Sequence, residues 1–185
     1  MQWVQKYKRA DEVSAQNRVA SPKSSCSDPA VKTIVKITKN LSDTIADEQE
    51  SHHNLFMSAE NIQGVLLEEY IDSKISVLGW IWCKGSTLRA VDFCTFDGRN
   101  LLQVKNKSNS ENSSSGRVRE GTDIKKWFRL GTCTRGGRKY PVYRWDKLNQ
   151  IIVETTHIQC DMSELEYIQF VKRIAAANPA IITAD

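Results

Sequence analysis

The 185-residue chain is predicted to fold as an α/β domain, with a mixed central sheet flanked by helices. Three observations predict this class. Apolar residues at helical spacing precede three short β-branched or aromatic runs, an Asp-Gly turn separates two of those runs, and a capped amphipathic segment follows near the end of the chain. The expected core order is helix, strand, strand, strand, helix, strand (αβββαβ), and a further helix follows it.

Residues 1–57 are predicted to form a helical, polar N-terminal extension. The segment 21–29 is rich in Ser and Pro and is expected to be a linker. Asp28 and Pro29 suit the N-cap and first position of a helix that ends near residue 40. The acidic and polar stretch 43–54 is expected to be a loop.

The core is expected to begin at Ser58, which can cap an amphipathic helix reaching about residue 75. Three strands are predicted next, over residues 78–83, 87–96 and 100–107. The turn between the last two contains Asp97-Gly98, a dipeptide that hairpins favour.

The C-terminal part is predicted to alternate irregular and regular segments. A polar loop over 108–116 precedes a helix over 123–130, and a basic segment with Gly and Pro follows at 132–146. A buried strand over 150–155 and a capped helix over 163–179 complete the pattern.

The composition argues against several classes of protein. Five scattered cysteines without a C-x-x-C pair do not suit a disulfide framework or a zinc ribbon, and three histidines offer little for a zinc site. No apolar run approaches the roughly 20 residues that span a bilayer. We therefore expect a cytoplasmic protein without a membrane partner.

Positive charge is concentrated in one segment. Between Arg99 and Lys147 there are 13 Lys and Arg against 4 Asp and Glu, whereas the whole chain has a net charge of only +4. Such a segment suits a polyanionic partner. A solvated, lysine-rich surface remains the alternative.

The residues that suggest chemistry lie on the second and third predicted strands. Asp92 can supply a carboxylate, Gln103 an amide oxygen and Val104 a backbone carbonyl. Alternation places Gln103 and Lys105 on one face of their strand. These oxygen donors suit Mg²⁺, and Lys105 can orient or deprotonate a water and stabilise negative charge.

This element order and these residues resemble the PD-(D/E)XK nuclease superfamily, with Asp92, Gln103 and Lys105 in its motif positions. Val91 stands in place of the motif's proline, and Gln103 in place of its usual Asp or Glu. The resemblance implies a restriction-endonuclease-like core and a metal site formed by Asp92, Gln103 and the Val104 carbonyl.

The superfamily also implies a glutamate on the helix before the hairpin. Glu68 follows Gly64 by four residues and matches this position, and Glu69 is the alternative. Glu68 is therefore expected to bind or orient a second metal ion.

The longer stretch 77–129 is similar to type II restriction endonucleases of the SinI-like group. The resemblance covers roughly residues 58–155 and implies that 58–185 form the nuclease domain. It implies sequence-specific, Mg²⁺-dependent hydrolysis of double-stranded DNA by a homodimer, with a DNA methyltransferase as the functional counterpart.

Within that domain, the loop and helix over 106–130 are expected to bind DNA. Their basic residues would contact phosphates, and their Asn and Glu side chains would contact base edges. The candidate contacts are Asn106, Lys107, Asn109, Ser110, Glu111, Asn112, Arg117, Arg119, Lys125 and Lys126.

Two other interpretations remain open. The chain can be a catalytically inactive, nucleic-acid-binding remnant of this fold, which the Gln at position 103 favours. It can also be a basic structural domain, in which case Asp92 is a strand carboxylate paired with Arg89. A fold that separates Asp92, Gln103 and Lys105 would favour the latter.

Overall fold

The structure is a computed structural model, and it describes residues 2–13, 17–19, 28–107, 121 and 123–182. Helix α1 (Gln2–Asp11) lies apart in sequence from α2 (Pro29–Lys39) and the long α3 (Asp43–Ile75). The predicted start of α2 is confirmed, because the Asp28 side chain accepts a hydrogen bond from the Ala30 amide (2.9 Å). Its end at Asn40, which adopts a left-handed conformation, is confirmed as well.

The prediction of a loop over 43–54 is wrong, since these residues form the first turns of α3. Ser42 caps the helix by accepting a hydrogen bond from Ile45. Ion pairs of Lys32 with Asp47 and of Lys36 with Asp43 then hold α2 against it. These contacts stabilise a helix whose polar composition alone suggested a loop. The predicted helix start at Ser58 is wrong as well, since α3 continues without interruption through residues 57 and 58. The helix is about 50 Å long.

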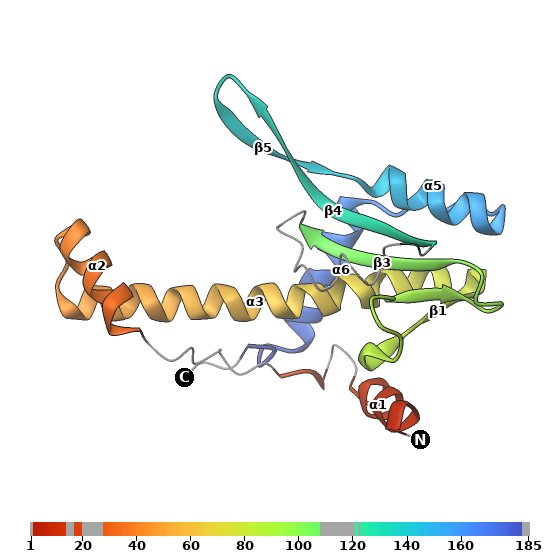
Figure 1. The fold of residues 1–185 in the computed structure, drawn as a ribbon, viewed down its shortest axis with the longest axis horizontal. Helices are drawn as coiled ribbons and strands as arrows, with labels where there is room; N and C mark the ends of the chain where they lie inside the picture. Colours follow the sequence, from red (N-terminus) through yellow and green to blue (C-terminus); the bar gives the residue numbers. More distant parts are fainter. Residues whose placement is uncertain (1, 14–16, 20–27, 108–120, 122, 183–185) are drawn as a thin grey trace.

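The five strands form one mixed sheet in the order β1-β2-β3-β4-β5 (Figure 1). The strands are β1 (Trp80–Trp82), β2 (Phe93–Thr95), β3 (Leu101–Lys107), β4 (Ile124–Arg135) and β5 (Arg138–Tyr143). Strands β3 and β4 are parallel, and the other neighbours are antiparallel. The predicted α/β class with a mixed sheet is confirmed.

Three further predictions are wrong. The basic segment 132–146, expected to be irregular, contains the end of β4, all of β5 and the start of α5. The segment 123–130 is the start of β4 rather than a helix, because alternation buries Trp127 and the strand pairs with β3 along most of its length. The segment 150–155 lies in α5 (Trp145–Thr156), where Leu148 and Ile152 are buried four residues apart on one helix face. The C-terminal helix α6 (Glu164–Ala177) begins after its Ser163 cap as predicted.

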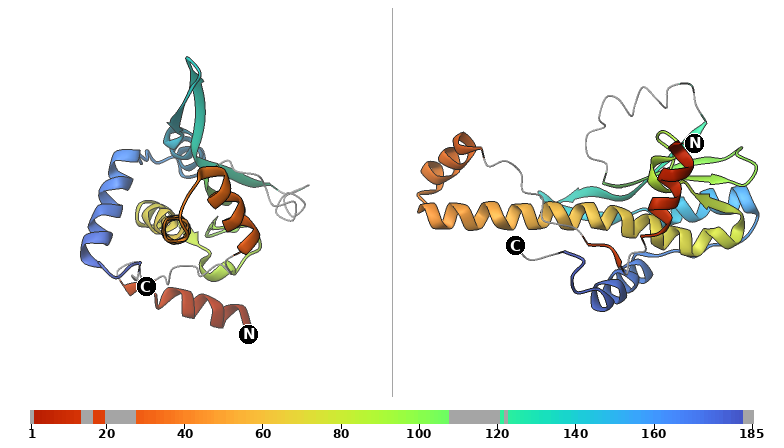
Figure 2. Two further views of the ribbon diagram at one scale, coloured as in Figure 1. Left: turned by 90° about the vertical axis from the view of Figure 1, so that its left-hand side faces the viewer. Right: turned by 90° about the horizontal axis from the view of Figure 1, so that it is seen from below.

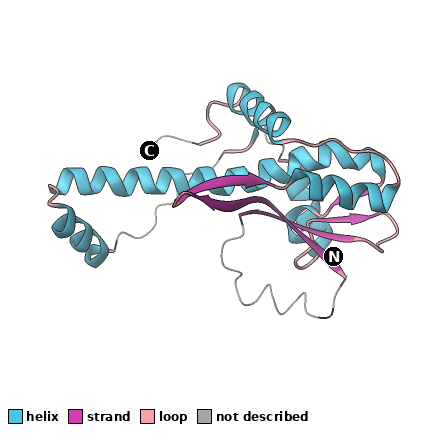
Figure 3. Ribbon diagram, turned by 90° about the horizontal axis from the view of Figure 1, so that it is seen from above, coloured by secondary structure: helices cyan, strands magenta, loops and turns pink. Residues whose placement is uncertain are grey.

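One hydrophobic core joins one face of the sheet to α3, α5 and α6. Leu102 and Val104 from β3 are buried in it, and the intervening Gln103 points to the other face. Seen end-on, α3 lies between α6 and the strands, and the β4–β5 hairpin rises away from the helices (Figure 2). The view coloured by secondary structure shows the same hairpin crossing above α3 (Figure 3). In the described part of the chain, no helix is long and apolar enough to cross a membrane.

Candidate active site

The hairpin places Asp92 beside the middle of β3. The Asp92 amide donates to the carbonyl of Leu102 (2.9 Å), and its carbonyl accepts from the amide of Cys83 (2.8 Å). Its side chain is fixed as well, because Oδ2 accepts a hydrogen bond from the Val104 amide (2.7 Å). The carboxylate is therefore held against the backbone of the strand that carries Gln103 and Lys105.

All four side chains that the sequence indicated as catalytic line one pocket of about 620 Å³. They are Glu68 from α3, Asp92 from the segment before β2, and Gln103 and Lys105 from β3. Gln103 is only 3% exposed, whereas Lys105 is exposed. The alternative residue Glu69 does not line this pocket.

Glu68 is held by a hydrogen bond from the indole Nε1 of Trp82 to its Oε2 (3.0 Å). Burial, followed by repulsion from Asp92, raises the pKa of Glu68 from 4.5 to about 7. The Trp82 hydrogen bond and the charges of Lys105 and Arg18 oppose this rise. Glu68 is thus a carboxyl group that changes protonation state near neutral pH.

Burial also raises the pKa of Asp92, although the hydrogen bond from Val104 and the charge of Lys105 act in the opposite direction. Two buried carboxylates that repel each other form a site whose ionised state a cation would stabilise. In the described part of the chain, no three His, Cys, Asp or Glu side chains gather into a metal cluster. A cation here would therefore take further oxygen ligands from Gln103 or the backbone.

The Val104 carbonyl is placed to be such a ligand. The N–H and C=O groups of one strand residue point to the same edge of the strand. Because the Val104 amide points to Asp92, its carbonyl projects toward the same edge. Carboxylate, amide and carbonyl oxygens form the hard donor set that Mg²⁺ binds.

The structure describes some of the residues that were predicted to contact DNA and not others. Lys107 pairs with Glu60 (2.6 Å), and the Lys126 ammonium lies 4.6 Å from the centre of the Phe128 ring. Asn109, Ser110, Glu111, Asn112, Arg117 and Arg119 lie outside the residues that the structure describes.

The other two described candidates, Asn106 and Lys125, belong to the strand face that packs on the helices. Asn106 Oδ1 accepts a hydrogen bond from Nε of the buried Arg129 (3.0 Å). Lys125 reaches Glu154 of α5 (3.9 Å). Both side chains are engaged within the protein.

The N-terminal segment also contributes to the pocket, which the sequence did not indicate. Ala10, Val13 and Arg18 line it together with the four catalytic candidates. Helix α1 is held nearby by an ion pair of Asp11 with Lys84 (2.6 Å). Among the described residues, Nε of Arg18 is buried and has no hydrogen-bond partner. Nothing in the local sequence around Arg18 indicates this role, because the contact joins distant parts of the chain.

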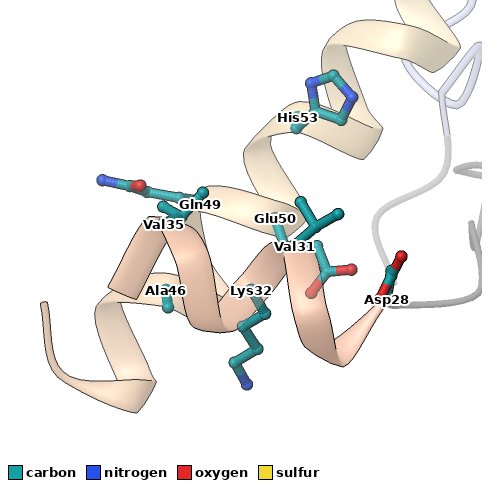
Figure 4. A pocket seen from close by; sticks show the side chains of 8 residues that line it. All are labelled: Asp28, Val31, Lys32, Val35, Ala46, Gln49, Glu50 and His53. Carbon is teal, nitrogen blue, oxygen red and sulfur yellow. The ribbon is translucent and has the colours of Figure 1, made fainter. Parts of the chain in front are cut away.

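A second pocket, of about 450 Å³, lies between α2 and α3 (Figure 4). Val31 and Val35 of α2 line it together with Gln49, Glu50 and His53 of α3. It contains none of the catalytic candidates.

The chain is similar in sequence to known restriction enzymes. The model of the SinI restriction endonuclease family matches residues 4–177. The type II restriction enzyme Eco47I of Escherichia coli is 44% identical over 116 residues, which are 60% of this chain and 50% of the relative. The type II restriction enzyme SinI of Salmonella infantis is 41% identical over 113 residues, 59% of this chain and 49% of the relative.

The chain spans about half the length of these curated relatives. The family model, in contrast, covers all but the ends of the chain, including most of α1 and the elements that form the pocket. The chain therefore belongs to the SinI restriction endonuclease family.

Proposed function

We propose that the protein is a site-specific endonuclease that hydrolyses phosphodiester bonds of double-stranded DNA with Mg²⁺ as its cofactor. The observation that carries this proposal is the pocket in which Glu68, Asp92, Gln103 and Lys105 meet from three separate elements. Membership of a restriction endonuclease family, and two relatives named as type II restriction enzymes, support it.

Asp92, the amide oxygen of Gln103 and the Val104 carbonyl would hold Mg²⁺, and Glu68 would bind or orient a second ion. Bound Mg²⁺ supplies Lewis acidity toward a phosphoryl oxygen and lowers the pKa of a coordinated water. The hydrogen bond from Val104 fixes the Asp92 carboxylate before any cation arrives. Such preorganisation avoids the cost of rearranging ligands during the reaction.

Lys105 lines the pocket and lies on the same face of β3 as Gln103. Its exposed ammonium can approach a bound phosphate and stabilise the negative charge that develops on it. Lys105 also helps to position the attacking water or to take its proton.

Recognition would use the basic part of the chain, with the loop and strand residues over 106–130 at the DNA backbone and base edges. A palindromic site would be read by a two-fold homodimer. A DNA methyltransferase that modifies the same sequence would protect the DNA of the host, and both would act in the cytoplasm.

The test is cleavage of plasmid DNA with and without Mg²⁺ by the wild-type protein and by Asp92→Asn. We expect Mg²⁺-dependent cleavage that Asp92→Asn abolishes, while binding to duplex DNA is retained because phosphate contacts supply most of the affinity. Asp97→Asn is the matched control, since Asp97 lies in the exposed hairpin turn outside the pocket.

A wild-type protein that binds DNA without cutting it would instead be an inactive nucleic-acid-binding relative. A protein that does neither would be a structural domain. Retained cleavage by Asp92→Asn would remove Asp92 from the active site.

A further inference from the structure

The outer part of the β4–β5 hairpin extends beyond the sheet. Strand β3 pairs with β4 only as far as Lys107, which lies opposite Leu130. Among the residues that the structure describes, β4 from Gly131 onward pairs only with β5. Residues 131–143, here called the ribbon, therefore form a two-stranded projection that stands clear of the helices in two perpendicular views (Figures 1 and 2).

Most of the ribbon is exposed to solvent, although Gly131 at its base is buried. All six residues of β5 are exposed, including large side chains such as Tyr140, which is 45% exposed. An isolated two-stranded hairpin buries little surface and is marginally stable in water. An exposed ribbon of this length thus indicates a surface shaped for a partner rather than for the stability of the domain.

The charge of the ribbon identifies the kind of partner. The ribbon contains Arg135, Arg138 and Lys139 and no acidic residue. In the described part of the chain, the three cations nearest the tip make no ion pair. Two copies of the ribbon would repel each other, so a polyanion fits this surface and pairing of one ribbon with another does not.

The register at the tip leads to the same conclusion. Arg135 and Arg138 lie directly opposite each other as the last pair before the turn. Like charges in cross-strand pairs are destabilising, and an anion between them removes the repulsion. The turn is Gly136-Gly137, and both residues have positive φ (55° and 75°), as a compact two-residue hairpin turn requires. The tip is therefore narrow as well as basic.

The dimensions suit duplex DNA. The major groove of B-DNA is about 12 Å wide and admits a two-stranded β-ribbon. Lys105 in the pocket lies opposite Phe128, and Arg135 is seven residues further along β4. That separation is about 23 Å along the strand. It is shorter than one turn of the duplex, about 34 Å, so the pocket and the ribbon can contact the same turn of one DNA molecule.

We propose that the ribbon is a second DNA-binding element, which enters the major groove next to the scissile phosphate with Arg135, Arg138 and Lys139 at the flanking phosphates. The proposal rests on the proposed function for the identity of its ligand, duplex DNA. It adds a contact surface outside the segment 106–130.

The test is the triple variant Arg135→Ala/Arg138→Ala/Lys139→Ala. Binding is measured by fluorescence anisotropy with a short duplex of random sequence, in EDTA and at several salt concentrations. Each lost phosphate contact should reduce the log–log salt slope by about 0.9 and the affinity at 0.1 M salt by up to about eight-fold. We expect a slope smaller by about 2–3 and an affinity lower by at least about ten-fold.

The matched control removes three exposed cations elsewhere, in Lys39→Ala/Lys172→Ala/Arg173→Ala on α2 and α6. Equal losses in both variants would show a general effect of net charge and would overturn the proposal. An unchanged slope in the ribbon variant would overturn it too. Because all three ribbon side chains are exposed, folding should be unaffected, which circular dichroism checks.

The assay separates this proposal from the proposed function, because binding in EDTA does not depend on cleavage. If the protein does not cut DNA, but the ribbon variant binds DNA more weakly than the wild type in EDTA, the ribbon is still a DNA-binding element. If the protein cuts DNA and its binding in EDTA is the same with and without the ribbon cations, the endonuclease proposal stands and the ribbon proposal falls.

Discussion

The buried carboxyl group of Glu68 predicts a specific dependence of stability on pH. In the metal-free folded protein its pKa is about 7, raised from 4.5 by burial and by Asp92. Between these pH values the folded state holds a proton that the unfolded state has released. The contribution of this group to stability is therefore fully present below about pH 4.5 and is lost as the pH rises through about 7.

The size of the loss follows from the shift. Each pKa unit corresponds to 1.36 kcal/mol, so the rise from 4.5 to about 7 corresponds to about 3 kcal/mol of stability. Glu68→Gln keeps the shape of the side chain and an oxygen that accepts from Trp82, but it cannot ionise. We expect the free energy of unfolding of the wild type to fall by about 3 kcal/mol more than that of the variant between mildly acidic and mildly alkaline pH.

Urea unfolding in EDTA at a series of pH values, followed by tryptophan fluorescence, measures this difference. Asp92 also has a raised pKa. Because it is present in both proteins, the comparison reports the titration of Glu68 together with its repulsion from Asp92. Glu69→Gln, one residue along and outside the pocket, is the control and should retain the pH dependence of the wild type. Parallel curves for wild type and Glu68→Gln would refute the electrostatic description of the site.

Three further predictions concern single residues. Gln103→Glu should lower the Mg²⁺ concentration for half-maximal cleavage, because a hard cation prefers an anionic oxygen; superimposable Mg²⁺ titrations would place Gln103 away from the metal. Glu164→Gln should cost about 3 kcal/mol in urea unfolding, because it leaves the buried guanidinium of Arg129 without its anion; a loss below about 1 kcal/mol would count against this ion pair. Arg18→Gln should raise the pKa of Glu68, since the charge of Arg18 lowers it; an unchanged midpoint in carboxyl NMR titration would contradict their coupling.

The features that the sequence predicted correctly depend on local chemistry. The cap by Asp28 and the end of α2 at Asn40 are set by neighbouring residues, as is the hairpin turn at Asp97-Gly98. That hairpin brings Asp92 to β3, so alternation was sufficient to place it beside Gln103. The superfamily resemblance then added Glu68 from the preceding helix.

The features that were missed depend on contacts between distant residues. Strand β4 forms by pairing in parallel with β3, and its basic and aromatic residues also suited a helix. The first turns of α3 are stabilised by lysines of α2, fifteen and seven residues away in sequence. Arg18 reaches the pocket from a segment that local patterns treated as a separate extension. A pattern within a short window does not contain these interactions.

The two halves of α3 have different surroundings, and this determines where the helix opens first. Its C-terminal half buries Leu66, Leu67 and Ile71 in the core beside Glu68, whereas further toward the N-terminus Leu55 and Phe56 are exposed to solvent. Backbone amides exchange with solvent through local opening, which costs least where few apolar contacts are broken. Opening of α3 is therefore expected to start in its N-terminal half, together with α2 that packs on it, and to stop where the core begins. The backbone that positions Glu68 belongs to the part of the helix that opens only with the domain as a whole.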